Sequence, residues 1–408
     1  MARPAFYPAQ LNLSLVQTIQ RMTPWLARLL YQLDLVISTA PAVQMAELRN
    51  SPCLFLCNHP TFDDPLVMFL VSAVVRQPFH YLAAYERFGG LKGWLLQQIG
   101  AYSIRRGQAD RDSVAYTLKL LARPDCKLVI FPEGGCSFQN DTVMPFRPGA
   151  VQMALQAVAK RVKQGDDREF CLMPISLKYR YSERMEPILE RSLSRLETEL
   201  GLPGLGGSFY ERLRRVAATV MGRFEQEYDL TPSDPANWNQ RISDLKAQVL
   251  TQCEQRLNLA PAAHELNRER VYRIQHSLAK RYQLGEDGSN RIFVNGADQW
   301  EVMRQSLARV LNFDAIYDGY VSERPTPERF LDTVTRLERS VFNIDQPPPK
   351  GHRQAFVRIG QPVQILPYLA EYERNRSATV TALTEHMQQT VQQNLNLLSD
   401  ATARDISW

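Results

Sequence analysis

Five short apolar runs before residue 180 have the length and composition of buried β-strands. Between the first two, Asp63-Asp64-Pro65 opens an apolar stretch that reaches about Val75, which is typical of a helix. Another helix is expected around Gly93-Trp94. This alternation of strands and helices predicts an α/β domain. The strands are expected at Cys53–Cys57, from Tyr81 onward, just before Arg105-Arg106, at Lys127–Phe131 and at Cys171–Leu177.

Residues 181–350 follow a different pattern, with apolar positions at three- and four-residue spacing among abundant Glu, Arg, Lys and Gln. Glycine and proline break it, as in Gly201–Gly207, and three prolines in Gln346–Lys350 indicate a linker. A small helical bundle is predicted, acting either as a lid or partner-binding cap over a cleft or as a stabilising addition. Its helices are expected at Leu189–Leu200, Tyr210–Tyr228, Trp238–Leu284 and Pro327–Phe342.

Near the N-terminus, Thr23-Pro24 has the character of a helix start. Apolar residues then recur on one face, while Arg28 and Gln32 occupy another. Such a helix rests in a lipid headgroup layer or packs against the protein's own core, and the pattern leaves both open. Ser377–Leu398 predicts a further surface helix. The apolar positions of the first helix are Trp25, Leu26, Leu29, Leu30, Leu33 and Ile37.

Length and composition are those of a folded protein with a sizeable core, at 408 residues, 44% hydrophobic and 22% charged. The net charge of +5 favours loose attraction to anionic lipid over nucleic-acid binding, for which no aromatic and basic motif is seen. Six cysteines without paired spacing favour a reducing compartment and argue against structural zinc. No run approaches the roughly 20 apolar residues of a spanning helix, and no secretory signal is recognised.

His59 and Asp64 lie five positions apart where the first expected strand turns into a helix. An Asp in the first helical turn is held ionised by the helix dipole and can reach back to the histidine. Such a carboxylate fixes the imidazole tautomer and stabilises the imidazolium that forms when the ring takes a proton. The alternative is a capped helix start, with Asp63 or Thr61 as the cap and His59 binding a backbone group.

Two further segments carry candidate chemistry. Arg105-Arg106 places two guanidiniums at a strand end, which suits a phosphate, although a solvated basic edge is the alternative. After the Lys127–Phe131 run, Gly134 and Gly135 let backbone amides approach the oxyanion of a tetrahedral intermediate. Ionised Glu133 cannot donate to that oxyanion, so it is expected to anchor the turn or to bind a substrate hydroxyl. An ordinary exit from the strand is the alternative.

Four blocks follow one another along the chain: Asn58-His59…Asp64, Gly93-Trp94…Ile104-Arg105-Arg106, Phe131-Pro132-Glu133-Gly134 and Met173-Pro174-Ile175-Ser176. Their order resembles the motif blocks of the glycerophospholipid acyltransferases, the lysophosphatidate acyltransferase-like family. The resemblance implies a glycerol-3-phosphate acyltransferase-like mixed sheet flanked by helices, with His59 as general base and Asp64 orienting it. It also implies that Arg106 contacts a phosphate of the acceptor, that Glu133 and Gly134 bind the acceptor, and that Pro174 lines the cleft.

The implied reaction moves a fatty acyl group from acyl-CoA or acyl carrier protein directly to a hydroxyl of a glycerolipid. The default acceptor is 1-acyl-glycerol-3-phosphate or another lysophospholipid. The donor is a co-substrate, so no cofactor and no metal are implied, and a cytoplasmic protein bound peripherally to a membrane surface is expected. Two competing interpretations are a non-catalytic lipid-binding or scaffold protein and a thioesterase-like hydrolase in which the same base activates water.

The chain departs from the family where Thr-Arg-Ser usually follows Phe-Pro-Glu-Gly, because Gly135-Cys136-Ser137 stands there instead. Arg105 or Arg147 is the candidate to supply the missing charge, and Cys136 is interpreted as a lining residue. The resemblance resumes at Ala355–Val363, which looks like the closing strand of the family's sheet. The chain is therefore expected to contain an N-terminal amphipathic helical segment (1–50), the catalytic core (51–180), a helical insertion (181–350), and the closing strand with a C-terminal helix (351–408).

Overall fold

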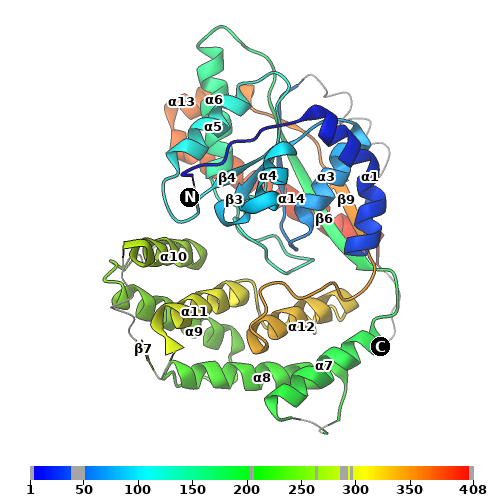
Figure 1. Ribbon diagram of the computed structural model, residues 1–408, viewed down its shortest axis with the longest axis vertical. Coiled ribbons are helices and arrows are strands. Elements are labelled where there is room, and N and C mark those ends of the chain that lie inside the picture. The colour runs from blue at the N-terminus through cyan, green and yellow to red at the C-terminus, as the bar shows by residue number, and fades with distance from the viewer. Residues whose placement is uncertain are drawn as a thin grey trace. The chain divides into compact units, whose positions relative to one another are not determined.

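The computed structural model describes residues 4–37, 51–202, 204, 206–261, 265–284, 293–294 and 297–403 (Figure 1). Its internal contacts divide the chain into two compact units, which we call the sheet unit and the helical unit. The sheet unit comprises Met1–Arg105, Asp110–Glu183 and Gly351–Trp408. The helical unit comprises Arg106–Ala109 and Arg184–Lys350.

Within the described residues, the sheet unit is built on eight strands in the order β1-β9-β6-β2-β5-β3-β4, with β10 paired to the start of β6. Pairing is parallel from β6 through β2, β5 and β3 to β4, whereas β9 runs antiparallel to β6. The expected mixed α/β fold is confirmed. The strands are β1 (Leu33–Ile37), β2 (Cys53–Cys57), β3 (His80–Ala84), β4 (Ala101–Ile104), β5 (Lys127–Ile130), β6 (Cys171–Tyr181), β9 (Arg353–Ile359) and β10 (Val363–Gln364).

Strand β2 illustrates how both faces of the sheet are covered. Leu54 and Leu56 point into one hydrophobic cluster, while Cys53, Phe55 and Cys57 point into another, as the alternation of side chains along a strand requires. Helices α5, α6 and α14 pack on the first face, and α1 and α3 on the second (Figure 1). The helices of this unit are α1 (Leu13–Tyr31), α3 (Asp64–Val75), α4 (Gly90–Gln98), α5 (Arg111–Leu121), α6 (Gly149–Val162), α13 (Leu369–Arg374) and α14 (Arg376–Ala401), with short 3-10 turns at Tyr85–Arg87 and Leu366–Tyr368.

The N-terminal helix differs from the one expected. Asn12 caps α1 by accepting a hydrogen bond from the amide of Leu15 at 3.1 Å, so the helix begins well before Pro24. Pro24 lies inside α1, where it has no amide to donate to the helical hydrogen bonds. Leu33 and Ile37 were expected on the apolar face of this helix, but Leu33–Ile37 forms β1, whose backbone pairs in parallel with β9. Residues 38–50 of the expected N-terminal segment lie outside the described residues.

The helical unit contains helices α7 to α12 and a short strand pair, β7 with β8. Ser208 caps α8 reciprocally: its hydroxyl accepts from the amide of Glu211, whose carboxylate accepts from the amide of Ser208. The expected helical stretch Trp238–Leu284 is two helices, and α11 was not expected. The elements are α7 (Glu186–Leu200), α8 (Phe209–Glu227), α9 (Trp238–Arg256), α10 (Asn267–Leu284), β7 (Phe293–Val294), β8 (Ala297–Asp298), α11 (Gln299–Phe313) and α12 (Pro327–Val341).

Pro174 lies at an interruption in the pairing of β6. Strand β9 pairs with β6 from Ile175 onward, and β10 pairs only with Cys171 and Leu172. The amide of Gly360 donates to the carbonyl of Pro174 at 2.9 Å. A Cβ atom on Gly360 would lie 2.8 Å from Cγ of Pro174, so the two residues pack tightly. A proline is accommodated here because it faces a break in the ladder.

Candidate active site

His59 follows β2 directly and lies near the turn that follows β5, at the carboxyl ends of two adjacent parallel strands. Ligands of open α/β sheets bind at this end. Its Nδ1 atom lies 2.6 Å from Oδ2 of Asp64, the first residue of α3. The Asp64 side chain is fully buried, whereas the His59 ring is 15% exposed. The structure therefore joins the two residues singled out in the sequence, with the carboxylate buried and the imidazole partly exposed.

The alternative of a simply capped helix does not describe this turn. Asp63 occupies the N-cap position but makes no side-chain capping hydrogen bond. Thr61 instead binds the carboxylate of Asp64, since its amide and its hydroxyl each donate to that carboxylate at 2.9 Å. The imidazole binds a carboxylate and not a backbone group, as a dyad requires.

A third residue that binds Asp64 is Tyr179 in β6, whose hydroxyl donates to Oδ1 at 2.6 Å. Burial raises the pKa of Tyr179 well above its ordinary value, and the negative charges of Asp64 and Asp63 raise it further. The phenol therefore remains a donor throughout the physiological pH range. Sequence reasoning missed this residue, because only the pairing of β6 with β2 brings it to the dyad.

The His59 ring is packed by two neighbours. Phe131 stacks on it, with ring centroids 4.5 Å apart and planes inclined by 26°. Cys136 Sγ lies 3.4 Å from Nε2 and 3.7 Å from Nδ1. These similar distances place the sulfur over the face of the ring, because an atom in line with the Nε2 lone pair would be much farther from Nδ1. The sulfur therefore does not lie in the plane of the ring along the lone-pair direction of Nε2.

Glu133 and the turn that contains Gly134 and Gly135, which we call the glycine turn, hold the backbone of His59 in place. The amide of His59 donates to Oε1 of buried Glu133 at 2.9 Å, and the carbonyl of His59 accepts from the amide of Ser137 at 2.8 Å. Gly134 adopts φ +74°, and its amide donates to the carbonyl of Phe131 at 3.0 Å. That amide is therefore engaged inside the turn, and Gly135 follows in the same loop. Glu133 holds the turn against His59, one of the two roles expected for it.

A paired anion site at Arg105-Arg106 was one expectation, but the structure gives these two arginines different partners. The Arg147 guanidinium lies against Gly134, so that a Cβ atom there would be 2.6 Å from Cζ. Arg105 donates to the carbonyl of Ala5 and lies 5.1 Å from the ring of Tyr85. Arg106 belongs to the helical unit, where its Nη1 donates to the hydroxyl of Tyr272 at 3.1 Å. Of these arginines, Arg147 is the one that the structure brings to the glycine turn.

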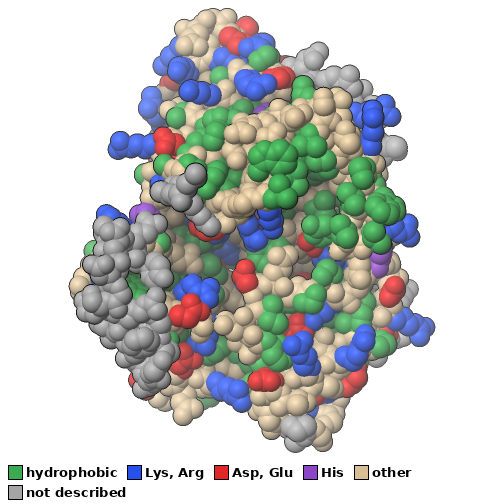
Figure 2. Space-filling view, in the orientation of Figure 1, with side chains coloured by type: hydrophobic (Ala, Val, Ile, Leu, Met, Phe, Trp, Pro, Cys, Tyr) green, Lys and Arg blue, Asp and Glu red, His purple; other side chains and the backbone are tan. Residues whose placement is uncertain are grey.

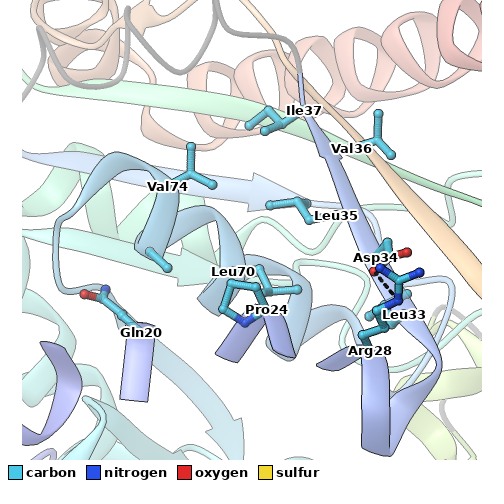
Figure 3. Close-up of a pocket in the computed structure, with 11 residues that line it drawn as sticks. Gln20, Pro24, Arg28, Leu33, Asp34, Leu35, Val36, Ile37, Leu70 and Val74 are labelled. Atoms are coloured by element: carbon cyan, nitrogen blue, oxygen red, sulfur yellow. Dashed lines mark ion pairs between the residues drawn. The ribbon is translucent and has the colours of Figure 1, made fainter. Parts of the chain in front are cut away.

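Two other features complete the description. Pro174 is buried within β6, opposite Leu56 of β2. A hollow of about 590 Å³ opens between α1, β1 and α3, where Leu35, Leu70 and Val74 line it and Arg28 forms an ion pair with Asp34 at 4.0 Å (Figure 3). The dyad does not line this hollow. Among the described residues, no group of three His, Cys, Asp or Glu side chains is arranged to hold a metal ion.

Comparison with known proteins agrees with this geometry. Residues 40–178 match the family described as acyltransferase. Over 141 residues the chain is 30% identical to a lyso-ornithine lipid O-acyltransferase of Pseudomonas aeruginosa, an alignment covering 34% of this chain and 50% of the relative. The chain thus spans about half the length of the curated relative it matches. The matched residues include β2, α3, β5 and the turn that holds Glu133. Residues 40–178 therefore form a domain of the glycerophospholipid acyltransferase family.

Proposed function

We propose that this protein transfers a fatty acyl group from a thioester donor, acyl-CoA or acyl carrier protein, to a hydroxyl of a lysolipid or related glycerolipid. The observation that carries the proposal is the 2.6 Å contact between His59 Nδ1 and buried Asp64, with the His59 side chain 15% exposed. A carboxylate bound at Nδ1 keeps the proton on that nitrogen, so the lone pair resides on Nε2. A neutral imidazole of this kind is a general base for an alcohol.

The reaction follows from that arrangement. Nε2 of His59 takes the proton of the acceptor hydroxyl as its oxygen attacks the thioester carbonyl, and Asp64 stabilises the resulting imidazolium. The tetrahedral intermediate then collapses, its carbon–sulfur bond breaks, and the departing thiolate recovers the proton from His59. No acyl-enzyme forms in this scheme. Glu133 contributes indirectly by holding the backbone of His59.

For the acceptor we propose a chemical class of lipid and not a single compound. Glycerophospholipid acceptors such as 1-acyl-glycerol-3-phosphate need a cation for their phosphate, and Arg147 beside Gly134 is our candidate for that role. The family's usual arginine position holds Cys136, which favours a second candidate class without a phosphate. The relative's name gives one such acceptor, a lyso-ornithine lipid, whose headgroup is an amino acid.

We further propose that the sheet unit docks on an anionic lipid bilayer through α1 and α4. Exposed apolar side chains gather over these two helices (Figure 2), and backbone hydrogen bonds from Gln10 to Gln97 and from Asn12 to Gln98 tie their ends together. Tryptophans beside exposed basic residues suit the boundary between headgroups and acyl chains. The exposed apolar residues include Met22, Trp25, Leu29 and Leu30 of α1, and Leu91 and Trp94 of α4. The exposed basic residues beside them are Arg21, Arg28 and Lys92. Among the described residues no helix is both long and apolar enough to cross a bilayer.

Product analysis tests the function directly. Purified protein is incubated with acyl-CoA or acyl carrier protein donors and a panel of lysophospholipids and lyso-ornithine lipid, and products are read by mass spectrometry. We expect acylated lipid and free thiol in equal amounts, with the donor intact when acceptor is omitted. Steady release of free fatty acid without acceptor would instead identify the hydrolase, and an inert donor under every condition would favour the lipid-binding protein.

A further inference from the structure

Asp64 sits in a hydrogen-bonding arrangement that extends well beyond the dyad. The carboxylate is fully buried and is bound by four groups: the His59 ring, the amide and hydroxyl of Thr61, and the hydroxyl of Tyr179. Burial of a carboxylate is costly unless its oxygens are satisfied. Tyr179 is the one of these partners that comes from a distant part of the chain.

Arg353 lies beside both the Tyr179 ring and Asp63. Its Nη2 donates to Oδ2 of Asp63 at 2.6 Å, and its guanidinium lies 5.4 Å from the centroid of the Tyr179 ring. The amide of Asp63 in turn donates to the hydroxyl of Thr61 at 3.1 Å. The two consecutive aspartates at the start of α3 are therefore held separately, Asp63 by Arg353 and Asp64 by Tyr179.

Strand register explains why these two residues meet the dyad. β6 runs parallel to β2 but is longer, so it continues past the point where β2 ends before His59. β9 returns antiparallel, with Arg353 opposite Tyr181 and Ala355 opposite Tyr179. A residue near the end of β6 and one at the start of β9 thus share the end of the sheet that carries His59.

We propose that Tyr179 is a positioning residue of the candidate active site, and that Arg353 holds its ring in place. The phenol would aim Asp64 at Nδ1 of His59 and share the negative charge of its carboxylate. This inference rests on the proposed function, because it assigns a role within the same reaction. Nothing in the general-base scheme itself requires a tyrosine at this position.

The direction of the effect follows from the hydrogen bond. Loss of the phenol leaves more negative charge on Asp64, which increases the proton affinity of the His59–Asp64 pair as a whole. His59 must be unprotonated to act as base, so the acid limb of the pH profile of kcat/KM should move upward. A charge-assisted hydrogen bond corresponds to a shift of about one pH unit.

The test compares Tyr179→Phe with Tyr102→Phe. Tyr102 is a matched control, since it is fully buried in the same sheet and its hydroxyl bonds Thr117 at 2.8 Å, apart from the dyad. We expect the acid limb to rise by about one unit in Tyr179→Phe and to stay unchanged in Tyr102→Phe. Arg353→Lys, which keeps a charge beside Asp63 but loses the flat guanidinium, should show a smaller shift in the same direction. Arg358→Lys, on the same strand, should show none.

A second measurement does not depend on turnover, and its fluorotyrosine arm does not depend on the stability of the phenylalanine variant. The His59 imidazole is titrated by NMR in the wild type, in Tyr179→Phe, and in protein carrying 3-fluorotyrosine at position 179, with His59→Ala assigning the resonance. The more acidic fluorophenol should lower the titration midpoint, and loss of the hydroxyl should raise it. Coincident midpoints in the three proteins, or a uniform loss of rate without a pH shift, would overturn the positioning role. If the wild type transfers no acyl group to any acceptor, the proposed function fails while the titration still decides this inference.

Discussion

Cys136 covers the face of the His59 imidazole, with its sulfur 3.4 Å from Nε2. It is also the one cysteine of the six that is not buried. A group attached to this sulfur would lie beside Nε2, where the acceptor hydroxyl approaches in the proposed reaction.

Thiol modification should therefore inactivate the protein. Iodoacetamide is expected to abolish acyl transfer by the wild type, because a carbamidomethyl group on Cys136 blocks access to His59. Cys136→Ala should retain most activity and resist the reagent, since the thiol takes no part in the proposed chemistry. Peptide mapping by mass spectrometry supplies the site of modification. Complete inactivity of Cys136→Ala in a folded protein would point instead to a thioester intermediate on that sulfur.

Removal of the base should affect rate far more than folding. His59→Ala is expected to lower kcat/KM by about 10²–10⁴-fold, the usual contribution of a positioned general base. Asp64→Asn should act in the same direction, because the amide cannot stabilise the imidazolium. His386→Ala is the matched control, as His386 is exposed on α14 of the same unit. Near-normal rates in His59→Ala would remove the base assignment.

Two glycines with left-handed backbone, Gly134 and Gly165, allow the stability cost of backbone strain to be separated from that of a side-chain clash. Gly134 and Gly165 both have positive φ, +74° and +83°, but only Gly134 has a neighbour within reach of a Cβ atom, the Arg147 guanidinium. Each alanine variant should cost about 1–2 kcal/mol for the left-handed backbone. Gly134→Ala should lose more than Gly165→Ala in urea denaturation, and only Gly134→Ala should impair catalysis. Equal losses of unfolding free energy in the two variants would mean that the Arg147 side chain moves aside without a cost in stability.

Lipid binding should depend on the exposed face of α1. Replacing Trp25, Leu29 and Leu30 together by serine is expected to weaken partition onto anionic vesicles by at least about tenfold, because apolar area leaves the interface. Leu397→Ser is the control, since Leu397 is 50% exposed on α14, which packs on the opposite face of the sheet. Vesicle sedimentation at low and high salt measures both variants. Equal partition of the triple variant and the wild type would argue against docking through α1.

A buried histidine predicts how stability depends on pH. Burial, together with the nearby positive charge of Arg123, lowers the pKa of His80 from its ordinary 6.5 to about 4. A lowered pKa in the folded state means that the unfolded chain takes up the proton first as pH falls. Stability supplied by neutral His80 is therefore full above about pH 6.5 and declines toward pH 4, by about 2 kcal/mol between pH 7 and pH 5. Urea denaturation of His80→Gln should show a correspondingly shallower decline, and parallel curves would contradict it.

Sequence reasoning found those parts of the site whose geometry is local. A strand that ends at Cys57, a turn and an acidic helix start suffice to bring Asp64 to His59, because only five positions separate them. The same reasoning misplaced the start of α1, since Pro24 fits a first helical turn as well as the interior position that it occupies. It missed Tyr179 and Arg353 because their contacts arise from strand pairing, which a single sequence does not specify.

The amide of Ser182 donates to the carbonyl of His352 at 3.0 Å, so the end of β6 and the start of β9 lie side by side where the chain leaves the sheet unit and returns to it. The whole intervening stretch, Arg184–Lys350, therefore connects the ends of two neighbouring strands, which a tight turn could also join. The register that carries Tyr179 and Arg353 is formed by β6 and β9, and both strands belong to the sheet unit. A change in the length of the intervening stretch can therefore leave that register as it is.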